Sequence, residues 1–380
     1  MEAVARAVSR ISERQGAALL AIAVVAVLLV PVAFGSFAQY LVLNVLLLAL
    51  FALSFNLLFG MTGLLSFGQA AFYAAGAYVA GLLLRARLPL LPSVMLGALA
   101  GAAIAAVVGA FCVRHTRVYF SMLTLAFGMF VYAIVWKWTD VTGGDDGLIG
   151  IPRGRLGLLG PFDPNLAPLS RYYVFAAVLV FVSVAVLHRL AISPFGLTLR
   201  AIRENAERAE FSGIRVRRTV FIAFVIAGFF AGLAGALLAP LEQTIAPTAA
   251  HWTKSAEPVM ATLIGGPLAF AGPIVGAAVY LGLKELIVRF TEYWLLVFGL
   301  VLLATCSRSA VVCSGRSAGL YATYDAAARG PRSSQVLRRL RRGRQGGPAA
   351  RWWRHHRGHR AERCGQDNVH QPAHRKAQAG

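Results

Sequence analysis

The stretch QYLVLNVLLLALFALSFNLLF (39–59) is 21 residues long and carries no charged side chain. A bilayer core about 30 Å thick needs about 20 apolar residues per helix, because lipid offers backbone amides no partner and a helix satisfies them internally. Further stretches of this kind span residues 17–37, 63–84, 91–113, 119–138, 171–190, 219–240, 258–283 and 291–303. The sequence therefore predicts an all-α polytopic membrane protein with roughly 8–10 transmembrane helices, some of them broken or re-entrant.

The composition separates the chain into two parts. Of its 380 residues, 58% are hydrophobic and 14% are charged, and the mean hydropathy is +0.65, which excludes a single soluble domain. Residues 304–380, however, hold 16 Lys and Arg against 3 Asp and Glu, and so contribute 13 of the net charge of +21. We expect an N-terminal cytoplasmic segment at 1–16, a transmembrane domain at 17–303 and a basic tail of low order at 304–380.

The positions of basic side chains predict which loops face the cytoplasm, because Lys and Arg are enriched there. Three arginines within residues 1–16 place the N-terminus inside, and six crossings later the Arg-rich loop at about 191–218 is inside again. The same count places the loop at about 139–170 outside. Arg85 and Arg87 also fall outside and count weakly against this scheme.

Glycine and proline interrupt two of the predicted spans. Proline removes a backbone donor and glycine weakens a helix, so we expect a broken helix at each place. Interrupted helices often line the pathway of a transporter, which makes Gly265 and Gly266 candidate pathway residues, with a structural kink as the alternative. The interrupting residues are Gly60, Gly63 and Gly68 in one place, and Gly265, Gly266, Pro267, Gly272 and Pro273 in the other.

Two glycine pairs have the spacing at which the backbones of membrane helices approach closely. They are Gly228-x-x-x-Gly232 and Gly272-x-x-x-Gly276. Small residues are favoured there because helices in lipid gain from close packing rather than from hydrophobic burial. We expect helix contacts at both pairs, although glycine is also common in membrane helices without such a role.

The Arg-rich loop contains a predicted amphipathic helix, GLTLRAIRENAERAEF (196–211). Leu199, Ile202, Ala206 and Ala209 have helical spacing on one side. A narrow apolar face on a helix held between two membrane spans suits the docking of a soluble partner, while a solvated linker is the alternative. Residues four apart can form ion pairs on the other side: Arg200 with Glu204, Arg203 with Glu207, and Glu204 with Arg208.

Few polar side chains lie near the break that precedes the third span. Asn56, Ser66 and Gln69 are the candidates for contact with a polar solute, and an interhelical hydrogen bond is the alternative role for each. Asp145 and Asp146 lie in the glycine-rich outer loop, where we expect either a turn or a docking surface for a soluble partner.

Site chemistry argues against an enzyme. Residues 1–303 contain no HExxH, no G-x-S-x-G, no phosphate-binding loop and no paired Cys/His ligands, so we expect neither catalytic residues nor a metal site. An ion-coupled secondary transporter or channel for a small polar solute is the alternative, and such a protein uses intramembrane carboxylates or bases. We expect almost none within spans 17–138 and 219–283, which favours transport driven by an external motor.

Three stretches together resemble the permease subunit of bacterial ATP-binding cassette importers for branched-chain amino acids, and the likeness covers roughly residues 15–303. Relatives in this family import urea, amides or other amino acids, so the resemblance fixes the substrate less firmly than the class of protein. The stretches are NLLFGMTGLLSFGQAAFYAAGAYVAGLLL (56–84), YFSMLTLAFGMFVYAIVWKWTDVTGGDDGLIGIPR (119–153) and SPFGLTLRAIRENAERAEFSGIRVRRTVFIAFVIAGFFAGLAGAL (193–237).

The resemblance implies a multi-pass subunit of the bacterial inner membrane that works with partners. These are a homologous second permease, two cytoplasmic ATPases and a periplasmic solute-binding protein, which Asp145 and Asp146 would contact. ATP is used by the ATPases, so this chain is expected to hold no cofactor. The helix 196–211 resembles the coupling helix that contacts the ATPase. The coupling residues expected on it are Gly196, Leu199, Arg200, Ile202, Arg203, Glu204 and Asn205.

The tail is interpreted as an out-of-frame translation. When HRAERCGQDNVHQPAHRK (359–376) is reverse-translated and reread one base later, the codons permit a run containing G-x-x-x-x-G-K-T, the phosphate-binding loop of an ATPase. We therefore expect a frameshift near Leu303 that carries translation into a neighbouring ATPase gene, and the coding DNA tests this. A disordered basic tail that binds nucleic acid or anionic lipid is the alternative; we expect no nucleic-acid partner.

Overall fold

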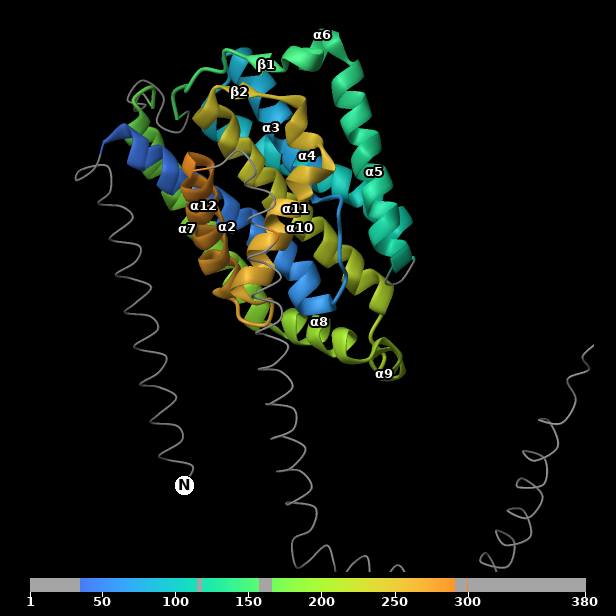
Figure 1. Cartoon of the computed structure of the whole chain (residues 1–380). Helices are drawn as coiled ribbons and strands as arrows, with labels where there is room; N and C mark the ends of the chain where they lie inside the picture. The colour runs from blue at the N-terminus through green and yellow to red at the C-terminus, as the bar shows by residue number, and fades with distance from the viewer. Residues whose placement is uncertain (1–34, 115–117, 157–165, 291–298, 300–380) are drawn as a thin grey trace, which may run out of the picture. The chain divides into compact units, whose positions relative to one another are not determined.

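The computed structural model describes residues 35–114, 118–156, 166–290 and 299, all within one compact unit that comprises residues 1–299 (Figure 1). The predictions for the segment 1–16, for most of the spans 17–37 and 291–303, and for the tail 304–380 lie outside the described residues.

Long apolar helices dominate the described residues, so the chain is an all-α polytopic membrane protein. Five helices are long and apolar enough to cross a membrane by length and composition, namely α2, α4, α5, α7 and α10. The longer helices are α2 (Ser36–Thr62), α3 (Gln69–Arg85), α4 (Leu90–Cys112), α5 (Val118–Lys137), α7 (Leu169–Ile192), α10 (Val216–Glu242), α11 (Trp252–Gly265) and α12 (Gly272–Phe290). The shorter elements are α6 (Thr139–Thr142), η1 (Gly144–Asp146), β1 (Leu148–Ile149), α8 (Pro194–Glu204), α9 (Ala206–Phe211), β2 (Thr244–Ile245) and η3 (Pro247–Ala250).

Helix α10 is the centre of the bundle and packs against α2, α3 and α4. Its contacts depend on glycine: a Cβ at Gly232 would lie 2.9 Å from Gly101 Cα on α4, and one at Gly228 would overlap Ala105. A Cβ at Gly276 would overlap the Ala261 carbonyl in the same way, where α12 crosses α11. Both predicted glycine pairs therefore lie at close helix crossings, where small residues allow backbones to touch.

The outer face of the bundle is apolar, as a helix facing lipid requires. On α7, Val174, Val178, Val182 and Val186 follow one another at four-residue intervals and each exposes 41–54% of its surface. The opposite face of α7 buries Tyr172 and Tyr173, and the Tyr172 hydroxyl donates to the carbonyl of Leu237 on α10. Helix α7 therefore holds to α10 by one side and presents the other to the bilayer.

Both expected helix breaks are present, and each shifts a predicted boundary. The predicted span 63–84 begins as a helix only at Gln69, because Gly63 at φ +75° ends α2 and residues 63–68 run without helical structure. The predicted span 258–283 is divided into α11 and α12, and Gly266 at φ +90° begins the turn between them. These positive φ angles suit glycine, which lacks a Cβ.

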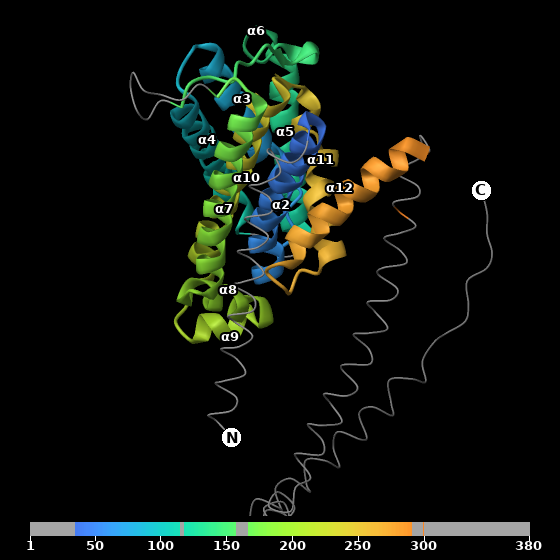
Figure 2. The same ribbon diagram turned by 90° about the vertical axis from the view of Figure 1, so that its left-hand side faces the viewer.

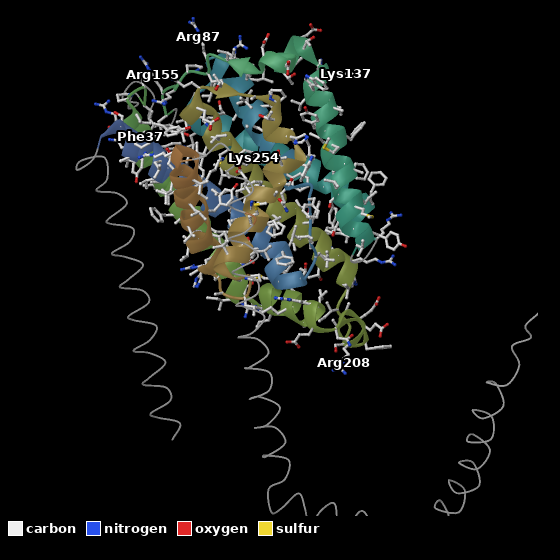
Figure 3. The ribbon with its side chains drawn as sticks, viewed as in Figure 1. Phe37, Arg87, Lys137, Arg155, Arg208 and Lys254 are labelled. Carbon is white, nitrogen blue, oxygen red and sulfur yellow. The ribbon has the colours of Figure 1, made fainter. Side chains whose placement is uncertain are left out.

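The two loops that were predicted to face opposite sides of the membrane lie at opposite ends of the bundle. At one end β1 pairs with β2, with Leu148 beside Ile245 and Ile149 beside Thr244, and α6 lies next to them (Figure 1). At the other end α8 and α9 lie across the helix ends (Figure 2). Lys137 lies at the first of these ends and Arg208 at the second (Figure 3).

Candidate functional site

The coupling segment forms two short helices rather than the single helix predicted over 196–211. Ser193 caps α8, where its Oγ accepts a bond from the Gly196 amide, and Pro194 occupies the first turn. Asn205 leaves the helical conformation at φ −159° and its Oδ1 accepts from the Arg208 amide at 3.0 Å, which caps α9. Sequence analysis missed this break because Asn205 was taken for a helix interior position, although asparagine favours helix N-termini.

The break at Asn205 separates two of the three predicted ion pairs. Arg203 and Glu207 now belong to different helices, as do Glu204 and Arg208, and within the described residues none of the three predicted pairs forms an ion pair. Arg203 instead donates from Nη1 to the carbonyl oxygen of Gly60 at 2.5 Å. This bond joins α8 directly to the last turn of α2.

Three of the four residues in the apolar stripe predicted as a docking face are buried within this chain, namely Leu199, Ile202 and Ala209, while Ala206 is exposed. Leu199 is fully buried and Ile202 is 6% exposed, and Ile202 packs in a small cluster with Ala209 and Val220. A Cβ at Gly196 would lie 2.7 Å from the Leu190 carbonyl, so Gly196 lets α8 turn tightly away from α7. These residues hold the segment against the bundle, and the opposite side of the segment is exposed.

That opposite side is exposed and partly apolar. Leu197 exposes 59% of its surface and Phe211 exposes 92%. Arg200 and Glu204 are exposed on α8 beside Leu197. A phenylalanine that exposed is unfavourable in water, which marks this surface as one that a partner could cover.

The three polar pathway candidates are buried around the break between α2 and α3. Asn56 is 6% exposed, and Ser66 and Gln69 are fully buried. Asn56 Oδ1, Ser66 Oγ and both amide atoms of Gln69 have no hydrogen-bond partner in the described residues. A buried polar atom without a partner costs about 1–3 kcal/mol, so four such atoms in one region require an explanation.

The surrounding backbone is held in place by hydrogen bonds from other helices. Ser121 on α5 donates to Leu65 O at 2.7 Å, and Ala70 N donates to Ser255 Oγ on α11 at 2.8 Å. The second break touches the same region, since a Cβ at Gly60 would lie 2.6 Å from the Pro267 carbonyl. Gly265 lies against Gly272 within that second turn, and Gly266 opens it with a positive φ. The polar candidates and both helix breaks thus form one connected region next to α8.

At the other end of the bundle, Asp145 and Asp146 are exposed on the short helix η1 directly before β1. Arg153 follows the strand and donates to the carbonyls of Pro240 and Leu241 at 2.9 and 3.0 Å. These two bonds satisfy carbonyls at the end of α10, which a helix leaves without internal partners. Arg153, which sequence analysis did not single out, therefore fixes the position of the residue that follows, Glu242.

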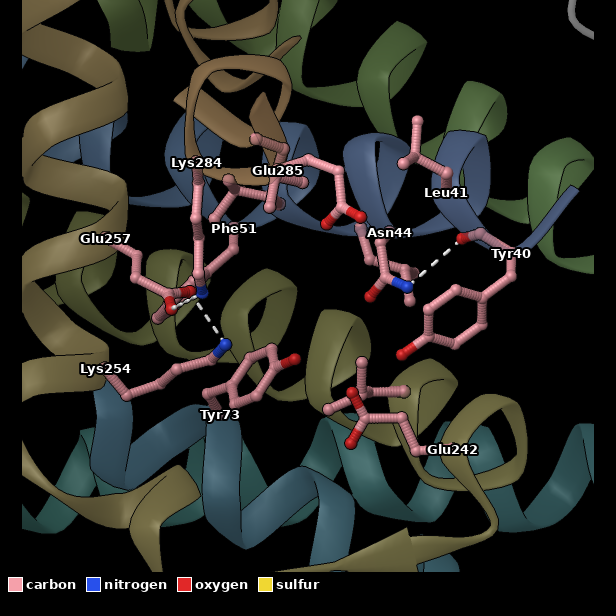
Figure 4. A pocket seen from close by; sticks show the side chains of 14 residues that line it. Tyr40, Leu41, Asn44, Phe51, Tyr73, Glu242, Lys254, Glu257, Lys284 and Glu285 are labelled. Atoms are coloured by element: carbon pink, nitrogen blue, oxygen red, sulfur yellow. Dashed lines mark hydrogen bonds and ion pairs between the residues drawn. The ribbon is translucent and has the colours of Figure 1, made fainter. Parts of the chain in front are cut away.

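Charged side chains gather around a cavity of about 220 Å³ between α2, α10, α11 and α12 (Figure 4). Lys254 Nζ lies 2.7 Å from Glu257 Oε2, and Lys284 Nζ lies 3.9 Å from Glu257 Oε1. Glu242 lines another part of the same cavity, as do Tyr40 and Asn44 (Figure 4). The Lys254 ammonium also lies 5.6 Å from the centre of the Tyr73 ring, a cation–π distance.

This cavity gathers ionisable side chains that the sequence analysis did not single out. Glu242, Lys254 and Glu257 lie between the predicted spans 219–240 and 258–283, and Lys284 directly follows the second span. They were overlooked because they flank the predicted apolar spans rather than interrupt them. The signal that could have found them is a charge near the end of an otherwise apolar span, which is unfavourable in lipid unless it is paired or faces a polar cavity.

A family model described as "Branched-chain amino acid transport system / permease component" matches residues 37–306. The chain is 30% identical over 269 residues to the high-affinity branched-chain amino acid transport system permease protein LivM of Escherichia coli, covering 65% of this chain and 63% of that protein. It is 26% identical over 253 residues to a probable branched-chain amino acid transport permease protein LivH of Methanocaldococcus jannaschii, covering 64% and 78%.

A shorter similarity extends over 118 residues to the guanosine ABC transporter permease protein NupQ of Bacillus subtilis, at 33% identity and covering 30% of this chain and 35% of that protein. The chain thus spans just under two thirds of the length of the bacterial LivM proteins that it matches. No solved structure matches. Since the family model covers most of the chain, the protein belongs to the family of permease components of branched-chain amino acid transport systems.

Proposed function

We propose that the chain is one of two homologous permeases that together form the membrane pathway of an ATP-driven importer for branched-chain or related amino acids. Family membership supports the class of function. The observation that carries the mechanism is the surface at the end of the bundle opposite β1 and β2, where Phe211 is 92% exposed while most of the apolar stripe of the same segment is buried. The segment is thus held rigidly to the bundle and offers its other side to a partner.

The partner at this surface is a cytoplasmic ATPase. The ATPase hydrolyses ATP, and this chain holds no nucleotide and no cofactor. Leu197 and Phe211 supply apolar anchors, and Arg200 and Glu204 supply charges that set the orientation of docking. Movement of α8 reaches the pathway through Arg203, whose bond to Gly60 O ends on the last turn of α2. Asn205 separates the two short helices and fixes the angle between them.

The pathway lies along the break between α2 and α3. Asn56, Ser66 and Gln69 have buried polar atoms without protein partners, which a passing polar solute or its water can satisfy. Gly265 and Gly266 form the neighbouring turn, and interrupted helices of this kind often line a transport pathway. These residues therefore remain candidates for solute contact.

The end that carries β1 and β2 faces the periplasm, and the N-terminus lies in the cytoplasm. Asp145 and Asp146 are exposed at this end and provide carboxylates for a soluble binding protein that delivers the solute. The subunit accordingly spans the bacterial inner membrane several times.

The docking surface is tested with the full chain, its companion permease and its ATPases in one membrane. Phe211→Ser should lower the amount of ATPase that copurifies with the permease, because it removes the most exposed large apolar side chain of the described residues. Ile149→Ser is the matched control, since Ile149 is 61% exposed at the opposite end. Vesicles in which this chain alone takes up substrate on an ion gradient would contradict the proposed function.

A further inference from the structure

The charges around the cavity between α2, α10, α11 and α12 balance one another. Glu285 also lines the cavity, and its carboxylate lies 3.9 Å from the guanidinium group of Arg289 on the same helix, which compensates its charge. The remaining groups are two carboxylates, Glu242 and Glu257, and two ammonium groups, Lys254 and Lys284. A ligand with a net charge would therefore leave one charge uncompensated in a poorly solvated site, whereas a ligand with equal and opposite charges would not.

The Glu242 carboxylate is the group most available to a ligand. Within the described part of the chain it forms no ion pair and no side-chain hydrogen bond, while Lys254 and Glu257 are joined to each other at 2.7 Å. Arg153 fixes the backbone directly before Glu242 by its bonds to Pro240 and Leu241. An ammonium donor could thus reach Glu242 while a carboxylate takes a donor position on Lys254.

A second cavity of about 510 Å³ is lined by the same charged residues. It shares Glu242, Lys254, Glu257 and Lys284 with the first cavity, and its remaining lining is mainly apolar, including Ile245, Trp252 and Met260. A volume of this size falls in the range of small-molecule sites. The charged residues therefore line both a polar cavity and an apolar one.

We propose that Glu242, Lys254 and Glu257 bind the zwitterionic head group of a free α-amino acid, whose aliphatic side chain enters the apolar cavity. The ammonium group of the ligand lies against Glu242 and its carboxylate against Lys254, with Glu257 holding the Lys254 ammonium in place. The site lies at the β1–β2 end of the bundle and would receive solute before it reaches Asn56 and Gln69. The assignment rests on the proposed transport function and adds the residues that recognise the substrate.

The same chemistry distinguishes this chain from a nucleoside permease. The guanosine permeases of Bacillus subtilis, by their names, serve a ligand without opposite full charges. A ligand that displaces water from the two ion-paired lysines and two glutamates must replace the lost hydration of these charges. A ligand without opposite full charges does not do so. Recognition of the head group also predicts which analogues fail: L-leucinamide lacks the carboxylate, and 4-methylpentanoate lacks the ammonium group.

The test measures equilibrium binding of radiolabelled L-leucine to the full permease–ATPase complex in detergent, without binding protein. Wild-type complex should bind L-leucine saturably, and L-leucinamide, 4-methylpentanoate and guanosine should each compete at least about tenfold more weakly. Lys254→Met and Glu242→Gln should weaken L-leucine binding at least about tenfold. Lys137→Met, which removes a lysine from the same end but outside both cavities, should bind as the wild type does.

Exchanging the charges of Lys254 and Glu257 distinguishes a role of this pair in ligand binding from a purely structural role. In the double variant Lys254→Glu with Glu257→Lys, a structural pair would be restored and binding would recover, whereas a head-group site would remain defective because its donor and acceptor are interchanged. Recovery of binding, or equal competition by L-leucinamide, would overturn the site. A complex that performs ATP-driven uptake with its binding protein but shows no saturable L-leucine binding would also overturn it, whereas absence of ATP-driven uptake would instead contradict the proposed function.

Discussion

Replacing Arg203 by Met should uncouple α8 from α2 without detaching the ATPase. Arg203 Nη1 donates to Gly60 O at 2.5 Å, and methionine keeps the apolar stem but has no donor. A hydrogen bond from a charged donor contributes about 1.5–3 kcal/mol. Because Arg203 is partly solvated, we take the contribution of this bond as about 1–2 kcal/mol. This corresponds to a factor of about 5–30 in the population of molecules in which α8 is bonded to α2.

The assay is the amount of substrate transported per ATP hydrolysed in proteoliposomes that contain the complete importer. For Arg203→Met this ratio should fall about 5- to 30-fold, while the amount of bound ATPase stays at the wild-type level. Arg200→Met is the matched control: Arg200 is exposed on the docking side, so its loss should change ATPase binding rather than the ratio. A normal ratio in Arg203→Met, or loss of the ATPase from it, would refute this account of the contact.

Three further predictions concern packing, the end of α10 and the pathway. Gly235→Ala should lower the free energy of unfolding by about 1–3 kcal/mol, seen as a lower melting temperature in detergent, because the added Cβ would overlap the Tyr73 carbonyl; Gly282→Ala, with open space around it, should not lower it. Arg153→Met should increase hydrogen exchange in the residues that follow α10, and unchanged exchange would show that its two bonds to α10 are dispensable. Gln69→Leu should leave the melting temperature unchanged or higher, since it removes two unpaired buried atoms, yet reduce uptake; normal uptake would remove Gln69 from the pathway.

The positions of the long helices could be predicted from the sequence because the constraint in lipid is local. Each segment must satisfy its own backbone hydrogen bonds, so length and hydropathy alone indicate where α2, α4, α5, α7 and α10 lie. The breaks near Gly63 and Gly266 are local in the same sense, since a positive φ favours glycine at the position itself.

The docking side of the coupling segment could not be predicted, because an apolar stripe does not reveal which protein covers it. Leu199 and Ile202 pack within this chain, which leaves Phe211 and Leu197 outward. Hydrophobic burial is non-directional, so the pattern predicts a covered face without identifying what covers it. The contact of Arg203 with Gly60, 143 residues away in sequence, was equally hidden.

The sequence by itself determined the membrane class, the approximate helices and the family, since these follow from apolar length and from motifs within single segments. Only the tertiary structure decided that Glu242, Lys254, Glu257 and Lys284 share one cavity. Glu242, the Lys254–Glu257 pair and Lys284 come from three different helices, and electrostatic interaction depends on distance in space rather than on separation along the sequence. Packing of α10, α11 and α12 against α2 brings the four groups together.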